Sequence, residues 1–586
     1  MANGFGSLYI GASGLQSAQN ALNTTANNLT NVNTTGYVRQ QVLHTDRNYN
    51  TFDTSAAISN QQYGLGVTIG DVIHARDIFL DKSLRTESGR QAFYAATAEA
   101  VNEVYTFYQE LEGEAYQDTL QDLWTAFQEL SKDPSDSVNQ NLVIQKASLF
   151  ISRSAGAYTG LTDYQSNINQ QISDDIDRIN ELGQTIFELN KAIKQVESNG
   201  VETAMTLRDE RDNCLDELST YVNITYEENV EGMVKVNIEG MGFVDEACCY
   251  EIGKQVDDIS GFITPYWPHT STPETGYYDE VFSYTTEISS EMGTDIGELK
   301  ALILARGDRN ANYTDILGVS ADSYNKSTAD QIATGMSVML QAEAQLDQLF
   351  HGIVTAINDL LCPNTEASNV IDFNGAKSVT ITDVNGVTHT IKADDLLLDA
   401  ENASVGIDGE LPPTELFKRI GTERYEKIEA ADGNVYYKYI PEDPTDTSKQ
   451  YTISGVEINH TLMEQETKFP HLTQDGQVDY ALAEQLAELW NIEDLCVDPN
   501  DTNKVTFMDY YSNMIGSLGT LGSVYESTSA SLSTTVTAIE NQRAQVIGVS
   551  SDEELTKMIK YQNAYNAASR YINVIDAMIE HLIMQL

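Results

Sequence analysis

Three short motifs in this 586-residue chain have residue types that could do chemistry, and each departs from the motif it resembles. Gly64-Leu65-Gly66 reaches its next glycine one residue late, at Gly70, and Gly240-Met241-Gly242 lacks the third glycine of a dinucleotide-binding loop. Gly548-Val549-Ser550-Ser551-Asp552 lacks the closing glycine of a nucleophile elbow. We interpret the first two as turns and the third as the start of a C-terminal helix.

Metal-binding chemistry would need several ligands close together on one element. Asp498 to Asp509 is acidic like a calcium loop, but Asn503 stands where the sharp turn of such a loop needs glycine. No histidine lies three or four residues from another, as is seen from His44, His74, His269, His351, His389, His460, His471 and His581. We therefore expect no metal site and no cofactor.

The charge of the chain excludes two classes of partner. Its 34 basic and 88 acidic residues give a formal net charge of −54 at pH 7, which would repel the phosphates of nucleic acids and of anionic lipids. We expect no nucleic-acid partner and no membrane partner, since no stretch reaches the about 18 apolar residues of a membrane span. The N-terminus also lacks the basic and apolar regions of a cleaved signal peptide. Five scattered cysteines predict free thiols: Cys214, Cys248, Cys249, Cys362 and Cys496.

The elements that must position any site are mainly helices, and the first of these has an unusual composition. Residues 1–38 contain no Asp, Glu, Lys or Arg, although 21% of the chain is charged. One face of this segment is a stripe with heptad spacing, which predicts a helix that packs on another helix. The opposite face, which runs from Ser13 to Asn28, is polar without being charged. The stripe comprises Phe5, Leu8, Ala12, Leu15, Gln19, Leu22, Ala26 and Leu29.

The chain also ends in a heptad stripe. Ser551 and Glu554 have the spacing of a capping box and predict where this last helix begins. We predict that the two terminal helices pair as a coiled coil, with the leucine side of the first helix facing the second. The second stripe runs to the last residue through Met558, Tyr561, Tyr565, Ala568, Ile572, Ile575, Ile579, Leu582 and Leu586.

Between the termini, helical and strand-like patterns alternate. Helical patterns precede the break at Lys132-Asp133-Pro134 and then cover 138–158, 172–196, 203–221, 325–361 and 507–548. Strand-like patterns occur at 222–296 and in hairpins around Asn385-Gly386 and Asp432-Gly433. The prediction is an elongated multi-domain rod, mainly α with β-rich insertions (α+β), with a central long-helix bundle and β-rich outer domains.

We divide this rod into four expected domains. A terminal helical assembly domain comprises residues 1–38 and 551–586. The remaining three are a helical bundle domain with a β-containing collar (39–221, 297–362 and 505–550), a small β-rich region (222–296) and a β-rich insertion domain (363–504). Because early and late helices bracket the β-rich segments, we expect the two chain ends to lie together, with the β-rich domains farther out.

One segment of the N-terminal region resembles a known signature. Residues 26–37, which include Asn27, Asn28, Asn31, Gly36 and Tyr37, closely resemble the N-terminal motif of the axial proteins of the bacterial flagellum. This group comprises the rod, hook and hook-associated proteins. Within it, residues 127–136, 207–212 and 548–554 resemble the hook-associated proteins of the hook–filament junction.

The resemblance implies a structural protein without catalytic activity. Such a protein would be exported unfolded through the flagellar type III apparatus, with an export chaperone and without a cleaved signal peptide, to the extracellular hook–filament junction. There it would assemble with itself into a ring of about eleven subunits. Its neighbours would be the hook protein and the second junction protein.

The uncharged N-terminal face fits such an assembly. In a ring, a charge on a buried face meets copies of itself, whereas Asn, Ser and Thr avoid both repulsion and desolvation. We therefore expect this face to contact neighbouring subunits, and both termini to be disordered until assembly. The alternatives are a hook protein or a flagellin. An acidic adhesin or carbohydrate-active enzyme displayed by the insertion is another, although no catalytic carboxylate pair can be singled out there.

Overall fold

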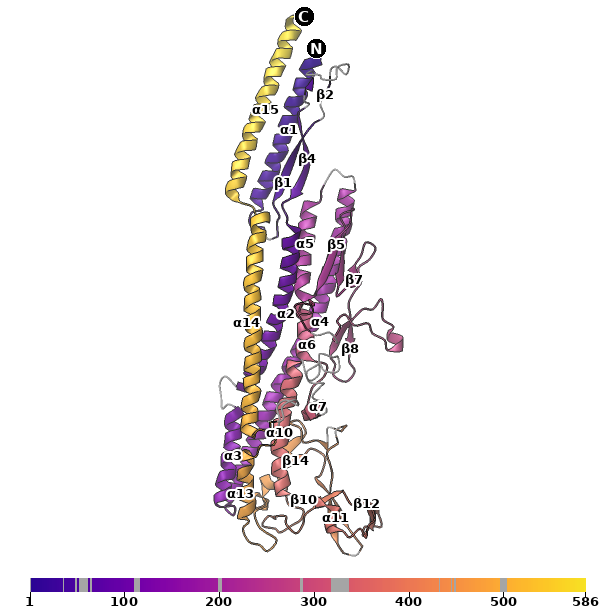
Figure 1. Ribbon diagram of the computed structural model, residues 1–586, viewed down its shortest axis with the longest axis vertical. Coiled ribbons are helices and arrows are strands. Elements are labelled where there is room, and N and C mark those ends of the chain that lie inside the picture. The colour runs from indigo at the N-terminus through magenta and orange to yellow at the C-terminus, as the bar shows by residue number, and fades with distance from the viewer. Residues whose placement is uncertain are drawn as a thin grey trace.

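The computed structural model shows an elongated rod with both chain ends at the same tip (Figure 1). It describes residues 2–34, 36–47, 50–51, 62–63, 66–109, 116–198, 203–284, 288–317, 337–431, 433–443, 445–446, 449–495 and 503–585. The fold is mainly helical with small antiparallel sheets, which confirms the predicted α+β rod.

At the tip, the first and last helices of the chain lie side by side (Figure 1). These are α1 (Ala2–Thr30) and α15 (Ser551–Gln585). They are antiparallel, because Gly11 lies against Ile572 while Asn28 hydrogen-bonds Glu554. The predicted pairing of the terminal helices is confirmed.

A β-hairpin packs beside α1 and forms the collar of the rod, which we define as residues 36–76. Its strands are β1 (Gln40–Asp46) and β4 (Val67–His74), which pair with a register shift between Leu43 and His44. Two short strands, β2 (Asn50–Thr51) and β3 (Gln62–Tyr63), pair in the same region.

Below the collar, a bundle of long helices forms the body of the rod (Figure 1). One continuous apolar core joins these helices, from Phe93 to Leu518. Two of them, α2 and α14, lie antiparallel along each other, as the contacts of Gly522 with Val101 and of Gly519 with Tyr105 show. The bundle helices are α2 (Ile78–Gln109), α4 (Ser137–Glu197), α5 (Met205–Tyr221), α6 (Glu298–Arg306), α10 (Val338–Leu361) and α14 (Phe507–Ile547).

The longest helix corrects the sequence analysis. The helices predicted at 138–158 and 172–196 are one continuous helix, α4, whose first turn is capped by the Asp136 side chain on Val138 N. No proline or glycine pair interrupts the segment between them, and a buried row from Leu161 through Ile168 to Ile172 continues the core face across the gap. The predicted helix at 325–361 appears as α10 from Val338, because residues 318–336 lie outside the described residues.

Two antiparallel units and a short helix lie beside the body. The first is a three-stranded sheet of β5 (Ile224–Glu228), β6 (Val234–Ile238) and β7 (Met241–Val244). The second is the hairpin of β8 (Gly253–Val256) and β9 (Ile263–Tyr266). A short helix, α7 (Tyr313–Leu317), follows α6.

The far end of the rod carries the insertion. A helix pair, α3 (Tyr116–Lys132) and α13 (Tyr480–Glu488), packs there. The predicted hairpin around Asn385-Gly386 is present as β11 (Ser378–Thr382) and β12 (Thr388–Lys392). The other hairpin is β15 (Tyr425–Glu429) with β16 (Val435–Tyr439), although Asp432 of its turn lies outside the described residues.

The remaining elements of the insertion are short. Some of them enclose a small separate core that contains Phe373, Ile391 and Ile428, whereas others contribute Phe417 and Ile458 to the main core of the body. They are β10 (Asn364–Glu366), α11 (Ala367–Val370), β13 (Leu396–Leu398), β14 (Phe417–Arg419), β17 (Val456–Ile458) and α12 (His460–Glu464). The element layout follows the order of the four expected domains, whose boundaries stay predictions.

Two composition-based expectations concern the described residues only. Cys214, Cys248, Cys249 and Cys362 are free thiols, and Cys496 lies outside the described residues. Burial raises the pKa of the Cys362 thiol to about 12, so this group stays protonated and unreactive. None of the described helices is both long enough and apolar enough to cross a membrane.

Candidate assembly site

Small residues line the side of α1 that packs on α15. Gly11, Ala18, Ala21, Thr25 and Asn28 are all buried. A Cβ on Gly11 would lie 2.7 Å from Cγ1 of Ile572, whereas a Cβ on Gly14 would lie 3.7 Å from Cβ of Ala568. The two helices therefore approach most closely where α1 has no side chain.

This packing corrects the predicted heptad stripe of α1. The alternate positions at Ala12 and Gln19 are exposed, and the buried alternates are Gly11, Ala18 and Thr25. The large Ile and Tyr side chains of α15 need small partners, so the small side of α1 turns toward them. The leucines flank the contact: Leu8, Leu15, Leu22, Leu29 and also Ala26 are half-buried, and the Phe5 side chain lies outside the described residues.

On α15 the predicted stripe faces α1. Leu582 near its end is 51% exposed, and Leu586 lies outside the described residues. Half-buried residues make up the rest of the stripe, namely Met558, Tyr561, Tyr565, Ala568, Ile572, Ile575 and Ile579. A role of these residues in contacts between subunits stays a prediction.

A second apolar row on α15 points away from α1. Ile559 is 60% exposed, Val574 57% and Met578 64%. Leu555 is also exposed, whereas Tyr571 lies against α1 at Gly11. A single chain therefore leaves apolar side chains uncovered on one side of its last helix, in two groups that are separated by polar residues such as Asn563 and Arg570. Exposed apolar groups that neighbour each other on a surface are typical of interaction sites.

The polar face of α1 is divided between two environments. Ser13 and Ser17 are buried against the collar, where Ser17 Oγ lies 3.0 Å from Nδ1 of His44. Asn20 and Asn23 are exposed on the same face. The expectation that this whole face meets neighbouring subunits is corrected, because its buried part is covered by the chain's own β1 and β4.

Asn28 is the buried centre of the axial-protein motif and joins three segments of the chain. Its Nδ2 donates to the Gln40 carbonyl at 2.9 Å and to Oε2 of Glu554 at 3.1 Å. Its Oδ1 accepts from the Tyr37 hydroxyl at 2.8 Å and from Gln40 N at 3.0 Å. One amide thus fixes α1, the collar and α15 together.

The other motif residues shape the turn after α1. The Asn31 side chain donates to the Asn27 carbonyl at 3.0 Å and holds the last helical turn, while Asn27 itself is exposed. Gly36 has a φ of 77°, and a Cβ there would lie 2.1 Å from the amide nitrogen of Asn213. Burial, with the nearby charges of Asp209 and Glu554, raises the pKa of Tyr37 to about 12, so its hydroxyl remains a donor.

Glu554 corrects the predicted capping box. The Ser550 hydroxyl, and not Ser551, caps the helix by accepting from Glu553 N at 3.5 Å. Glu554 turns inward instead, is 1% exposed and contacts Asn28 and Lys557. Glu554 has the residue type and spacing of a capping residue, but its conformation is determined by buried Asn28, which is 526 residues away in the sequence.

A network of ion pairs joins the collar to the bundle, and we call it the joint. Arg76 of the collar pairs with Asp81 of α2 at 3.0 Å and with Asp212 of α5. Arg543 of α14 pairs with Asp81 at 2.9 Å and with Asp216 of α5 at 2.7 Å. The collar, α2, α5 and α14 are therefore held together by charges that are mostly buried, and removal of one partner would be costly.

Asp209 extends the joint to the exit of α1. Its carboxylate accepts from Val38 N at 3.3 Å and lies 3.4 Å from Nδ1 of His74. Burial raises the pKa of Asp209 to about 6. Burial, with the nearby Arg76 and Arg208 charges, lowers the pKa of His74 to about 4. The sequence analysis noted residues 207–212 only as a resemblance, and the structure assigns four of them to the joint and its base.

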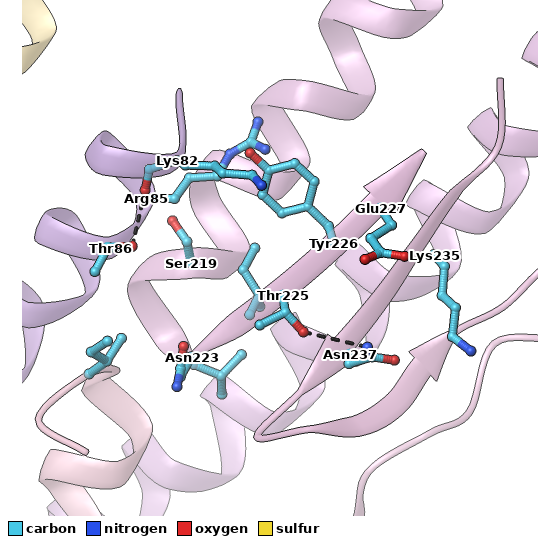
Figure 2. A pocket seen from close by; sticks show the side chains of 13 residues that line it. Lys82, Arg85, Thr86, Ser219, Asn223, Thr225, Tyr226, Glu227, Lys235 and Asn237 are labelled. Atoms are coloured by element: carbon cyan, nitrogen blue, oxygen red, sulfur yellow. Dashed lines mark hydrogen bonds between the residues drawn. The ribbon is translucent and has the colours of Figure 1, made fainter. Parts of the chain in front are cut away.

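The base of the joint is built on two arginines. The Arg208 guanidinium donates to Glu197 at 2.8 Å, and Arg211 donates to the Gly232 carbonyl at 2.6 Å. On α2, Arg85 lies 2.7 Å from Asp216 and stacks over the Tyr226 ring at 4.5 Å (Figure 2). A cavity of about 480 Å³ opens beside this stack, between α2, α5 and β5–β6. Within the described residues no cluster of His, Cys, Asp and Glu has the form of a metal site.

Sequence reasoning missed His74, Arg76, Asp81 and Arg543. None lies in a motif, and their partners are on elements far away in sequence. The one signal in the sequence that could have indicated the joint was the density of charged residues in 207–212, which is higher than a solvent-exposed helix face needs.

Three family models match parts of the chain. The model described as the helical domain of a flagellar hook-associated protein matches residues 101–362. A flagellar basal body rod protein model matches residues 8–37, which include the motif around Asn28. The model of the C-terminal region of basal body rod proteins matches residues 545–586, which include α15.

Whole-length relatives are similar to the chain at low identity. Flagellar hook-associated protein 1 of Bacillus subtilis is 24% identical over 584 residues, covering 97% of this chain and 96% of the relative. The protein of the same name from Salmonella typhimurium is 23% identical, with 97% and 98% covered. The solved flagellar hook junction protein of Burkholderia pseudomallei aligns with 79% of this chain and 100% of that chain, at 13% identity and a TM-score of 0.46.

Proposed function

The chain belongs to the family of flagellar hook-associated protein 1, a structural component of the bacterial flagellum at the hook–filament junction, and from this premise we propose how it is built into that junction. The pair of α1 and α15 is the assembly module. The bundle and the β-rich insertion form the outer body. The chain does no catalysis and works by holding neighbouring subunits together.

The observation that carries this proposal is the uncovered apolar row of α15 opposite its contact with α1. Ile559, Val574 and Met578 would be costly to leave in water on a helix that already has a partner. Exposed Asn20, Asn23 and Asn27 give α1 an uncharged surface of its own, and Asn20 and Asn23 lie on its side toward β4 and the start of α5. A second copy that covers both surfaces buries apolar area without bringing like charges together.

The finer features of the assembly follow from the family. We propose a ring of about eleven copies, in which one patch of each copy contacts a different patch of the next. The hook protein lies below this ring and the second junction protein above it. The chain reaches its place outside the cell through the flagellar type III route, with an export chaperone and without a cleaved signal peptide.

Removal of residues 552–586 tests this proposal. The bundle core does not use α15, so the truncated chain should remain a soluble, folded body by circular dichroism and urea unfolding. In cells that lack the full-length gene, the truncated chain should fail to attach filaments to hooks, and filament protein should collect in the medium. The full-length chain expressed from the same vector is the control. Normal swimming with the truncated chain would defeat the proposal.

A further inference from the structure

Two rows of exposed residues near the joint have similar arrangements of apolar and charged residues, and their charges are opposite. The first lies on α2, where Ile78 is 69% exposed and Phe79 is 76% exposed, followed one turn later by exposed Lys82. The second lies on α15, where exposed Asp552 is followed by Leu555 (45% exposed) and Ile559 (60% exposed). Each row follows helical spacing of three and four residues, so each forms one face.

Each row also contains one charged residue, Lys82 on α2 and Asp552 on α15. Among the described residues neither Lys82 nor Asp552 forms an ion pair, although basic residues are few in a chain with a net charge of −54. Lys82 lies at the rim of the cavity beside the Arg85–Tyr226 stack (Figure 2). Arg85, by contrast, is neutralised by Asp216. Lys82 is therefore the cation of this surface that remains available for a carboxylate.

The two rows also run in matching order. Helix α2 leads away from the joint into the bundle, and α15 leads away from it toward the tip (Figure 1). Along the rod axis, each row therefore has its charge on the bundle side and its apolar residues on the tip side. When two copies stand side by side with the same polarity, charge faces charge and apolar residues face apolar residues.

The rows lie on different parts of the surface. The α2 row borders β4 and α5, since Ile78 lines a hollow together with Ile73 and Met205. The α15 row lies off the α1 contact, which Glu554 and Met558 mark. Different patches on one molecule cannot pair with themselves, but they can pair between successive copies of a ring or helix.

Resting on the proposed function, we propose that the Ile78–Phe79–Lys82 row of one copy docks on the Asp552–Leu555–Ile559 row of the next copy. Phe79 packs against Leu555 and Ile559, and Lys82 pairs with Asp552. The contact lies at the joint, so it also holds the collar region of each copy against the terminal module of its neighbour.

Site-specific cross-linking in assembled flagella tests this contact. A chain with Phe79→Cys and Ile559→Cys should give covalent dimers and higher multimers when purified flagella are treated with a short bismaleimide. The single Phe79→Cys and Ile559→Cys variants are matched controls for the native cysteines and should give no such ladder. Immunoblots of the same flagella report whether the chain was incorporated.

The possible outcomes distinguish a failure of the proposed contact from a failure of the proposed function. Incorporation of the double variant without a ladder would overturn the docking and leave the junction role intact. If the wild-type chain itself is missing from flagella, the proposed function fails and the docking with it.

If the cysteine variant is not incorporated, charge variants test the docking instead. Lys82→Glu and Asp552→Lys should each lower the fraction of cells with filaments several-fold, and the two substitutions together should restore that fraction. No restoration would overturn the pairing.

Discussion

At the scale of single residues, the assembly module depends on the lack of a side chain at Gly11 as much as on the side chain of Asn28. Gly11 lets Ile572 approach the α1 backbone, and Asn28 uses both ends of its amide to join three segments. Each residue is suited to its position by the partners that it contacts there, which are Ile572 for Gly11 and Tyr37, Gln40 and Glu554 for Asn28. Changes at such residues should act on assembly and leave the bundle intact.

Gly11→Ala should weaken the pairing of α1 with α15. Its Cβ would lie 2.7 Å from Ile572 Cγ1, so one of the helices has to shift, at a cost of about 1–3 kcal/mol. We expect fewer cells with filaments and more filament protein in the medium. Gly14→Ala is the matched control, since its Cβ lies 3.7 Å from Ala568 in ordinary contact, and it should behave as wild type. Equal effects of the two substitutions would contradict this account.

At the scale of elements, the joint connects α2, α5 and α14 to the collar through buried charges with opposing pH responses. The pKa of His74 is lowered on folding, so its contribution to stability is present above pH 6.5 and is lost as the pH falls toward 4. The pKa of Asp209 is raised, so its contribution is present below pH 3.8 and is lost as the pH rises through 6. Between pH 5 and pH 7 the two trends oppose each other, and the contribution of His74 is the larger.

Single substitutions should reveal each trend. Relative to wild type, His74→Gln removes the histidine term, and its free energy of unfolding should fall by about 2 kcal/mol more as the pH rises from 5 to 7. Asp209→Asn should change in the opposite direction by about 1 kcal/mol over the same range. Urea unfolding of the free chain at both pH values measures this. Parallel pH profiles of the two variants would show that the joint does not couple these groups to folding.

The terminal helices should differ in order from the bundle before assembly. Helix α1 contains Gly4, Gly6, Gly11 and Gly14 and has little intrinsic helix stability, and α15 is covered on one side only. In hydrogen exchange of the free chain, we expect rapid exchange over residues 5–30 and strong protection over the buried row Ile168–Ile193 of α4. The same N-terminal amides should be protected in purified flagella. Strong protection across 5–30 in the free chain would contradict this prediction.

The elements also show what the sequence can and cannot predict. Heptad repeats identified α1, α15 and their pairing, because the period of apolar residues is a local property. The phase of α1 was wrong, since Leu15 and Gly11 lie on adjacent stripes and only the size of the α15 side chains decides which one faces inward. Glu554 and Asp209 have partners 526 and 171 residues away, and no local pattern contains that information.

At the scale of the whole molecule, the acidic residues that repel other copies and the uncharged segment lie in different parts of the chain. The net charge of −54 keeps free copies apart, while residues 1–38 carry no charge and belong to the module that must bring copies together. In the proposed assembly, the bundle and insertion therefore supply solubility and the tip supplies association.

Association of purified chains should increase with salt. Raising NaCl from 0.05 to 0.5 M shortens the screening length and weakens the repulsion between acidic bodies, whereas contacts between uncharged faces are retained. We expect the weight-average mass in sedimentation equilibrium to rise. The chain without residues 552–586 is the control and should stay monomeric at both concentrations. A fall in mass with salt would indicate that ion pairs, and not uncharged faces, dominate association.

The contact between Asn28 and Glu554 spans 526 residues, which places the partner of the first helix at the very end of the chain. A ribosome adding about 5–20 residues per second needs roughly half a minute to two minutes to reach it. During that interval the N-terminal segment has nothing to pair with, however fast the bundle folds behind it. Chain connectivity thus acts as a timer, which prevents this contact from forming before Glu554 has been synthesised.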